Sequence, residues 1–283
     1  MHLHRLATFI VLIFSSPLAL QAGELRFDVA PDESTWSSSG DRLACRLSQK
    51  IPHFGQALFT SHAGGDLTLS FSLEREPGKK RRTAHLRAVA PPWKHKTRSI
   101  EIAKVTLKTG KIPVVFGRNA ALRTLYELEK GMSPQLTFKD WADARDQITA
   151  SLSPVNLRPA LQLFQSCTGA LHPDGFNDVR DLNIYFGSDS YQLTEKSRAT
   201  LDRIASYLEV DPEITRIILN GFADKSGDDI YNQELSQMRM DTVQEYLMRK
   251  GVPAELIISI NHGPRKKGSR AKNRRVHIRM EKQ

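Results

Sequence analysis

Cysteine is almost absent from this sequence: Cys45 and Cys167 are the only two in 283 residues. Neither belongs to a Cys-x-x-Cys pair, and neither has a histidine nearby at ligand spacing, so a metal site built on them is not indicated. In an oxidising compartment an isolated pair of cysteines most simply forms a disulfide. Two unrelated buried thiols are the alternative, and the choice depends on where the protein resides.

Long hydrophobic runs are also absent, apart from one at the start of the chain. Arg5 precedes an apolar stretch at residues 6–14, which is too short to span a bilayer. Small residues follow, and we expect residues 1–22 to be a signal peptide that is cleaved after Ala22. No cysteine comes directly after the apolar stretch, so no lipid anchor is expected. The sequence therefore predicts an exported, soluble protein without a membrane span, and a buried N-terminal helix of a cytosolic domain is the alternative.

The common catalytic motifs are missing. The sequence contains neither a Gly-x-Ser-x-Gly elbow nor a His-Glu-x-x-His zinc motif, and its nine histidines are scattered. We therefore predict that the protein is not an enzyme and has no catalytic residue, metal ligand or cofactor. Carboxylates in the loop at residues 224–229 are the groups that could in principle act as acid and base in a hydrolase.

Acidic residues are missing from two strongly basic stretches. The formal net charge is +10, and it falls to about +9 once the signal peptide with Arg5 is removed. Residues 79–98 contain eight Lys/Arg and no acid, and residues 265–282 contain nine Lys/Arg against one acid, Glu281. An exported protein seldom meets nucleic acid, so we expect no nucleic-acid partner. Anionic polymers of the cell envelope or acidic protein surfaces are better candidates for the partner of these basic stretches. The alternative is that the basic residues only keep the surface solvated.

The first half of the chain has the pattern of a β-rich domain. Hydrophobic side chains alternate in residues 66–74, where Leu67, Leu69, Phe71 and Leu73 share one face. Residues 99–110 and 112–117 continue this style. Helices are expected at residues 120–131, where Gly131 is a natural stop, and roughly at residues 138–151.

The second half alternates strands and helices. Strands are expected at residues 182–186, 214–222, 256–261 and 275–280, and amphipathic helices at residues 193–210, with Thr194 as N-cap, and 231–251. This order predicts a sandwich of one sheet and two helices. The fold class is thus α+β, with a β-rich domain at residues 23–172 and an α/β sandwich at residues 173–283.

A charged loop lies between the second strand and the second helix of this sandwich. Asp224 comes just after the strand, and Arg239 lies about two turns into the helix, where its long side chain can reach back toward the loop. Together with the N–H groups of the helix start, they can line a pocket suited to a zwitterion. A calcium loop is excluded because Asp229 and Leu235 replace the required glycine and glutamate. A plain ion pair or a solvated loop remains the alternative on spacing alone.

Several motifs of the second half resemble the OmpA-like peptidoglycan-binding family. They occur in the family's order at residues 185–197 (YFGSDSYQLTEKS), 221–224 (GFAD), 231–239 (YNQELSQMR), 250–252 (KGV) and 273–278 (NRRVHI). The resemblance covers residues 178–280 and implies one mixed sheet with helices on one face. It also implies that Asp224 and Arg239 hold the diaminopimelate of the peptidoglycan stem. Other matching positions are implied to take part, namely Asn232, Leu235, Asn273, Arg274 and Arg275.

The sequence departs from this family in two places. Phe222 and Ala223 stand where the family usually has two polar residues before its aspartate, which removes two polar contacts. The stretch at residues 263–272 is short and intensely basic. These departures put the affinity for peptidoglycan in question, but not the fold.

The first half resembles the MotY family of periplasmic proteins in polar flagellar motors. The resemblance rests on residues 45–64, 90–94, 125–148 and 164–167, and both cysteines lie within these segments, which supports the disulfide. It implies a periplasmic protein at the flagellar basal body, which docks as part of a ring (the T ring) and helps to place stator units. The implied partners are peptidoglycan, the basal-body rings, MotX-like motor proteins and the stator B subunit. A general envelope-stability protein without a flagellar role is the alternative.

Overall fold

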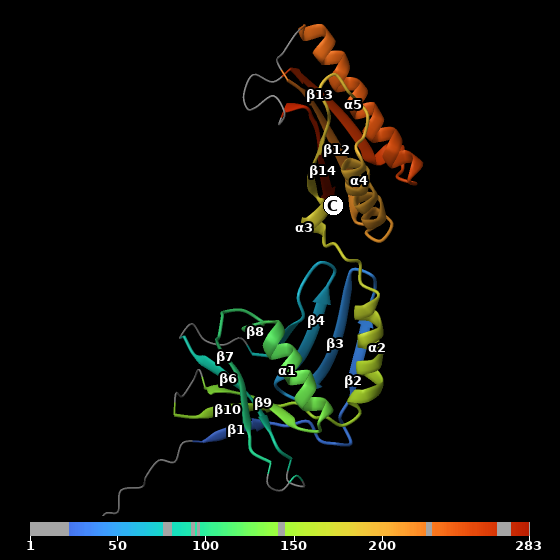
Figure 1. The fold of residues 1–283 in the computed structure, drawn as a ribbon. Coiled ribbons are helices and arrows are strands. Elements are labelled where there is room, and N and C mark those ends of the chain that lie inside the picture. The colour runs from blue at the N-terminus through green and yellow to red at the C-terminus, as the bar shows by residue number, and fades with distance from the viewer. Residues whose placement is uncertain are drawn as a thin grey trace, which may run out of the picture.

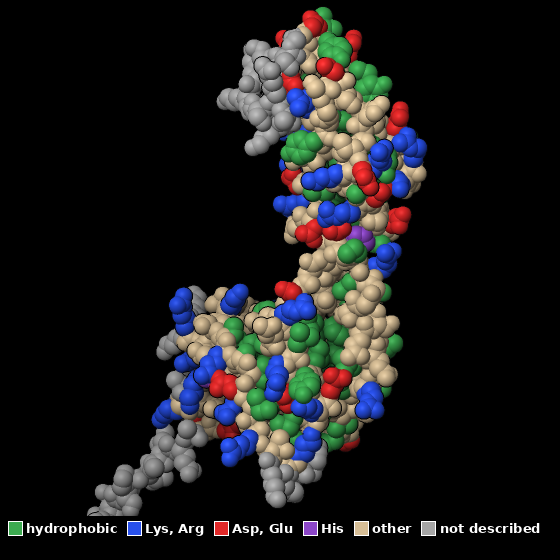
Figure 2. Space-filling view, in the orientation of Figure 1, with side chains coloured by type: hydrophobic (Ala, Val, Ile, Leu, Met, Phe, Trp, Pro, Cys, Tyr) green, Lys and Arg blue, Asp and Glu red, His purple; other side chains and the backbone are tan. Residues whose placement is uncertain are grey.

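A computed structural model of the protein describes residues 23–75, 81–91, 94, 97–140, 145–224, 228–264 and 273–282. The expected signal peptide at residues 1–22 and parts of both basic stretches lie outside the described residues. We call residues 23–172 the N-terminal half and residues 173–282 the C-terminal half. Figure 1 and the space-filling view in Figure 2 show the two halves as separate bodies that meet at a narrow neck.

The N-terminal half contains two five-stranded sheets. Sheet A has the order β1 (Glu24–Phe27), β10 (Gln147–Ser151), β9 (Ser133–Lys139), β6 (Thr83–Val89) and β7 (Ile100–Thr106). Sheet B has the order β2 (Trp36–Gly40), β3 (Ala44–Ile51), β4 (Gly55–His62), β5 (Thr68–Leu73) and β8 (Val114–Phe116). All neighbouring strands are antiparallel except β1 and β10, which run parallel.

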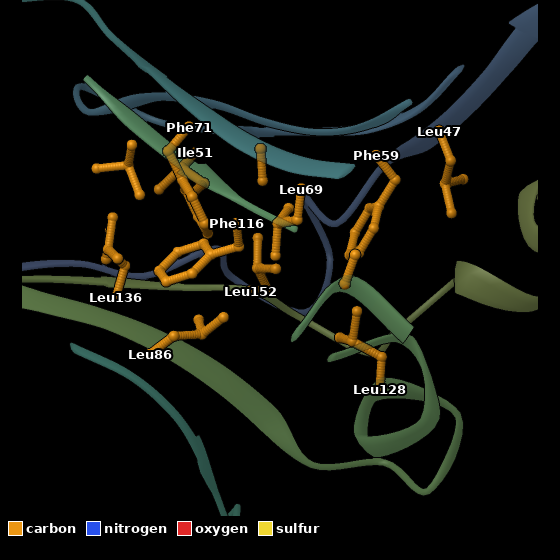
Figure 3. Close-up of a cluster of buried hydrophobic side chains, with 14 of the residues drawn as sticks. Leu47, Ile51, Phe59, Leu69, Phe71, Leu86, Phe116, Leu128, Leu136 and Leu152 are labelled. Atoms are coloured by element: carbon orange, nitrogen blue, oxygen red, sulfur yellow. The ribbon is translucent and has the colours of Figure 1, made fainter. Parts of the chain in front are cut away.

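One hydrophobic core holds these two sheets together. Alternate residues of β5 are buried, as the period-two pattern predicts, and Phe71 packs edge-on against Phe116 of the same sheet at 6.4 Å between ring centres. Figure 3 shows these rings with Leu86 and Leu136 of sheet A in the same cluster. Burial of large side chains contributed by both sheets makes this half a single packed unit.

Two helices cover this core, and only one of them was expected. α1 (Arg118–Glu129) confirms the predicted helix, and it buries Leu125 and Leu128 while Tyr126 stays exposed. α2 (Leu157–Gly169) packs on β2 and β3 and was missed. Its buried residues are Leu157, Ala160, Leu161 and Phe164, a helical spacing that could have revealed it.

The helix predicted at residues 138–151 is wrong. This segment contributes to two strands, β9 and β10, which pair antiparallel with Lys139 opposite Gln147. Leu136 and Phe138 are buried with a half-buried Thr137 between them, which is strand periodicity. The helix was predicted to begin at residue 138, inside β9, and to end at residue 151, the last residue of β10. One helix was therefore predicted where the chain forms the end of one strand and the whole of the next.

The predicted disulfide is confirmed. Cys45 in β3 is bonded to Cys167 in the last turn of α2, with 5.9 Å between their Cα atoms. The bond therefore joins sheet B to the helix that leads into the C-terminal half. Gly40 lies against it, and a side chain there would collide with the sulfur of Cys167.

The C-terminal half is the predicted sandwich of one sheet and two principal helices. Its mixed sheet, sheet C, has the order β11 (Asp181–Tyr185), β14 (Arg275–Lys282), β12 (Ile214–Ala223) and β13 (Ile257–Pro264). β14 runs antiparallel to both β11 and β12, whereas β12 and β13 run parallel. α4 (Glu195–Leu208) and α5 (Asp229–Arg249) lie on one face of this sheet (Figure 1). A short helix, α3 (Phe176–Val179), precedes β11, and a 3-10 turn (Ala254–Leu256) precedes β13.

Local signals explain where these helices begin and end. The Thr194 hydroxyl accepts a hydrogen bond from the Ser197 N–H at 3.1 Å, which confirms the predicted N-cap of α4. α5 begins two residues earlier than predicted, because the Asp228 carboxylate caps it by accepting from the Tyr231 N–H at 2.9 Å. The helix ends before Gly251, whose φ of +89° only glycine adopts readily. Within the part of the chain that the structure describes, none of the helices combines the length and apolarity needed to cross a membrane.

The neck between the halves is held by specific contacts. The His172 N–H donates to the carbonyl of Arg42 at 2.8 Å, and the His172 ring contacts Ser206 and Tyr207 of α4. Leu43, from the turn between β2 and β3, packs against the C-terminal core. Asp174 is also bound to α4, because Arg203 donates two hydrogen bonds to its carboxylate at 3.0 and 2.5 Å. These contacts fix the linker against both halves.

Loss of the Asp174 charge is expected to weaken the neck in a pH-dependent way. The hydrogen bonds from Arg203 hold the pKa of Asp174 below its ordinary value. The stabilisation is therefore present above the unfolded pKa of about 3.9 and is lost as the pH falls below it. We expect Asp174→Asn to lower the free energy of unfolding of the C-terminal half at pH 7 by less than about 1 kcal/mol, since Arg203 is half exposed.

Urea unfolding of the wild type and of Asp174→Asn at several pH values checks this. The difference between the two proteins should shrink as the pH is lowered from about 4. Asp241→Asn is a matched control, because Asp241 is exposed on α5 and pairs only locally with Gln237 in the structure's described part. A difference that stayed constant down to strongly acidic pH would contradict the assignment to this ion pair.

Candidate functional site

The carboxylate of Asp224 is buried at the end of a strand. β12 ends at Ala223, and Asp224, the next residue, is only 6% exposed. Arg274, just before β14, donates a hydrogen bond from its Nη1 to Oδ2 of Asp224 at 3.2 Å. Asp224 thus forms an ion pair with Arg274.

Arg239 is buried in α5 and is held by backbone carbonyls. Its side chain is 1% exposed, and it donates from Nε to the carbonyl of Ser190 at 2.9 Å and from Nη2 to that of Gly187 at 3.0 Å. Its guanidinium also lies 5.4 Å from the centre of the Phe186 ring. Arg239 therefore fixes the loop between β11 and α4. The sequence did not predict this role, because nothing in the spacing shows which carbonyls a long side chain will meet.

Asp224 and Arg239 nevertheless share one cavity, as predicted. It has a volume of about 280 Å³ and is lined by Ser188, Asp189, Asp224, Tyr231, Asn232, Leu235, Arg239 and Arg274. Five of the residues carried over from the family resemblance thus meet at this site: Asp224, Asn232, Leu235, Arg239 and Arg274.

Three lining residues were not predicted as site residues. Ser188 and Asp189 come from the loop that Arg239 holds, and Tyr231 is in the first turn of α5. Asp189 has a φ of +45°, a backbone conformation that is uncommon outside glycine. The family motif at residues 185–197 contains Ser188 and Asp189, so it was the signal in the sequence that could have pointed to them.

Two predicted site residues are not in the cavity wall. Asn273 is buried next to Arg274, and Arg275 points to the other face of the sheet, where its guanidinium lies 4.7 Å from the centre of the Phe222 ring. Phe222 belongs to that other face too, and Ala223 is fully buried. The Phe222 substitution therefore changes the face opposite the helices and leaves the described wall of the cavity as it is.

The cavity combines two carboxylates with two guanidinium groups. Burial, followed by the nearby positive charge of Arg274, lowers the pKa of Arg239, while Asp224 and Asp189 act in the opposite direction. The Nε of Arg274 is buried and has no hydrogen-bond partner among the described residues. The guanidinium groups of Arg239 and Arg274 make the cavity suited to an anionic group of a ligand. The predicted contribution of free N–H groups at the helix start is smaller than expected, because Asp228 already caps Tyr231.

Comparisons with known families divide the chain in two. Residues 27–173 match the family described as MotY N-terminal domain, and residues 185–280 match the OmpA family. The sequence is 28% identical to the sodium-type flagellar protein MotY of Vibrio parahaemolyticus over 267 residues, which is 90% of each chain. It is 35% identical to the peptidoglycan-associated lipoprotein of Haemophilus influenzae over 103 residues, which is 35% of this chain and 67% of that protein.

Two solved structures each match about a third of this chain. The peptidoglycan-associated lipoprotein of Burkholderia pseudomallei has 28% identity and a TM-score of 0.33, and the match covers 35% of this chain and 89% of that one. The C-terminal domain of Helicobacter pylori MotB has 23% identity and a TM-score of 0.33, and the match covers 36% of this chain and 85% of that one.

Proposed function

This chain belongs to the MotY family, and from that premise we propose that it is a non-enzymatic anchor between the flagellar motor and peptidoglycan. In this proposal residues 23–172 form the domain that docks on the basal body as part of a ring. Residues 173–283 form the domain that binds the cell wall. The protein would act in the periplasm at the basal body, beside MotX-like proteins, and help to position and retain stator units through their B subunit.

The observation that carries the wall-binding proposal is the cavity that is lined by both carboxylates and guanidinium groups. Diaminopimelate carries an ammonium group and a carboxylate on the same carbon, so it needs an anion and a cation at one place. Asp224 and Asp189 can take the ammonium, while the guanidinium of Arg274, which lines the cavity, can donate to the carboxylate. Arg239 supports this arrangement by holding the loop that carries Asp189.

The two-body architecture supports the motor half of the proposal. A stator can exert torque only if something holds it against the wall, so an anchor must transmit force between two attachment points. The neck of this protein is fixed by contacts on both sides, and the disulfide lies directly behind it. A chain built in this way resists bending better than two domains on a flexible linker.

Removal of the Asp224 charge is expected to abolish most wall binding. We expect Asp224→Asn to sediment with purified sacculi at least tenfold more weakly than the wild type, because a charge-assisted hydrogen bond to the ligand is lost. The substitution keeps the size of the side chain. Asp241→Asn is the matched control, since it makes the same change on the exposed side of α5 and should bind like the wild type. Sedimentation of Asp224→Asn at the wild-type level would contradict the assignment, and so would a wild type that does not sediment.

Motility separates the motor proposal from its alternatives. A chromosomal Asp224→Asn strain should swim poorly while it grows normally and resists detergent, and labelled protein should form a polar spot only where a basal body is assembled. Leaky cells that still swim would favour a general envelope-stability protein. Release of soluble muropeptides from sacculi by the purified protein would favour a wall hydrolase.

A further inference from the structure

The face of sheet C opposite α4 and α5 carries a row of four planar side chains. No helix in the described part of the chain covers this face (Figure 1). Tyr185 of β11 is opposite Arg275 of β14, and Arg275 is opposite Phe222 of β12. His262 of β13 completes the row, because its ring stacks on that of Phe222. We call these four residues the aromatic row.

The aromatic row is ordered by its own contacts. The rings of Phe222 and His262 are nearly parallel, with 4.7 Å between their centres and 9° between their planes. The Arg275 guanidinium lies 4.7 Å from the centre of the Phe222 ring. His262 is fixed further by a hydrogen bond of 2.9 Å between its Nε2 and Oδ1 of Asn220. A ligand that met this row would lose little entropy in ordering it.

Both ends of the aromatic row are open to solvent. Tyr185 is 49% exposed at one end, and His262 is exposed at the other. Four neighbouring strands span about 14 Å, so the row is longer than a single small ligand requires. It therefore has the dimensions and chemistry of a surface for an extended molecule.

The aromatic row and the cavity lie at the same end of the strands of sheet C. Asp224 in the cavity follows Phe222 of the row by two residues, and Arg274 in the cavity is directly followed by Arg275 of the row. Successive residues of a strand point to opposite faces, which explains why these two arginines serve different surfaces. The two surfaces therefore adjoin at the same end of the strands of sheet C.

We propose that the aromatic row binds the sugar rings of a glycan strand whose peptide stem occupies the cavity. This inference rests on the proposed function, because the cavity must hold the stem. In peptidoglycan the diamino acid is the third residue of a stem attached to a sugar, and three extended residues span about 10 Å. The proposal requires the stem to pass over the end of the strands that separates the two surfaces.

The chemistry of the aromatic row suits a sugar polymer. Aromatic rings offer flat apolar surfaces on which the C–H face of a pyranose packs. The exposed Tyr185 hydroxyl and the second ring nitrogen of His262, Nδ1, can form hydrogen bonds with hydroxyl and N-acetyl groups. The proximity to the cavity favours the wall over a protein partner, because both contacts then belong to one connected polymer.

Binding of defined wall fragments tests this proposal. The probes are a stem peptide without sugar and the same stem attached to its disaccharide, both measured by calorimetric titration. The wild type should bind the sugar-containing fragment about three- to tenfold more tightly than the free stem, which is the size expected of one or two ring contacts. The double variant Tyr185→Ala/His262→Ala should lose this difference and bind the free stem like the wild type.

The controls separate this proposal from the one on which it rests. Ile258→Ala changes an exposed side chain on β13 at the far side of the same face and should behave like the wild type. Failure of the wild type to bind the free stem would sink the cavity proposal. Equal binding of both fragments by the wild type would overturn the aromatic row as a glycan contact, and this result needs no variant to fold. Normal sacculus binding with lost recruitment to the motor in the double variant would assign the face to a protein partner instead.

Discussion

Reduction of the Cys45–Cys167 disulfide is expected to lower the free energy of unfolding of the N-terminal half by about 5 kcal/mol. The two cysteines are 122 residues apart, and a bond that closes so long a loop strongly restricts the unfolded chain. A small domain is typically stable by only about 5–15 kcal/mol, so this loss is a large part of the total. We expect the reduced N-terminal half to be marginally folded at best.

Tryptophan fluorescence makes this measurement specific. The three tryptophans, at positions 36, 93 and 141, all lie in the N-terminal half. The urea midpoint followed by tryptophan should fall sharply on addition of a reductant, while the C-terminal half, followed by its tyrosines, should keep its midpoint. A Cys45→Ala/Cys167→Ala variant should start at the reduced midpoint and ignore the reductant. An unchanged tryptophan midpoint after complete reduction would show that the bond contributes little.

The position of the disulfide gives its loss a second consequence. Cys45 follows the turn that carries Leu43, and Leu43 packs against the C-terminal core. Cys167 is in the last turn of α2, which leads to His172 and the linker. The bond thus ties together the two segments of the N-terminal half that contact the C-terminal half.

Much of the C-terminal half could be predicted from the sequence because its signals are local. The apolar stripe of α4, its cap at Thr194 and the stop at Gly251 are all set by neighbouring residues, and the structure has them as expected. The N-terminal half was harder. Its helix α2 has a clear apolar stripe, but it also contains Pro159. Proline usually interrupts a helix, although it is tolerated in the first turn, where Pro159 lies. A helix was predicted across β9 and β10 because its start was placed at residue 138, within the strand alternation of β9.

The site was predictable in position but not in its internal contacts. Motif order placed Asp224 and Arg239 at one strand end, and they do line one cavity. The sequence could not show that Arg239 would donate hydrogen bonds to the carbonyls of Gly187 and Ser190. Every residue has a backbone carbonyl, so no sequence motif marks the ones that a side chain will meet. It also could not show on which face Phe222 would lie, because that depends on the register of β12.

Replacement of Arg239 by methionine is expected to destabilise the C-terminal half by about 3 kcal/mol. Methionine has a similar length but no donor, so the buried carbonyls of Gly187 and Ser190 would lose their partners at about 1–3 kcal/mol each. The urea midpoint followed by tyrosine should fall, while the tryptophan midpoint stays unchanged. Arg249→Met is the matched control on the same helix, where the side chain is 65% exposed and only a small effect is expected.

This prediction decides how Arg239 takes part in wall binding. If Arg239→Met loses both stability and sacculus binding, while Asp224→Asn loses binding alone, then Arg239 acts by holding the loop of Asp189, and Asp224 contacts the ligand. Arg239→Met with wild-type stability and lost binding would instead make the guanidinium a direct ligand of the stem, and its carbonyl contacts would be incidental. A variant of Arg239 that destroyed the fold would give the same sedimentation result in either case. For this reason Asp224→Asn, and not a change at Arg239, is the substitution that tests how the protein binds peptidoglycan.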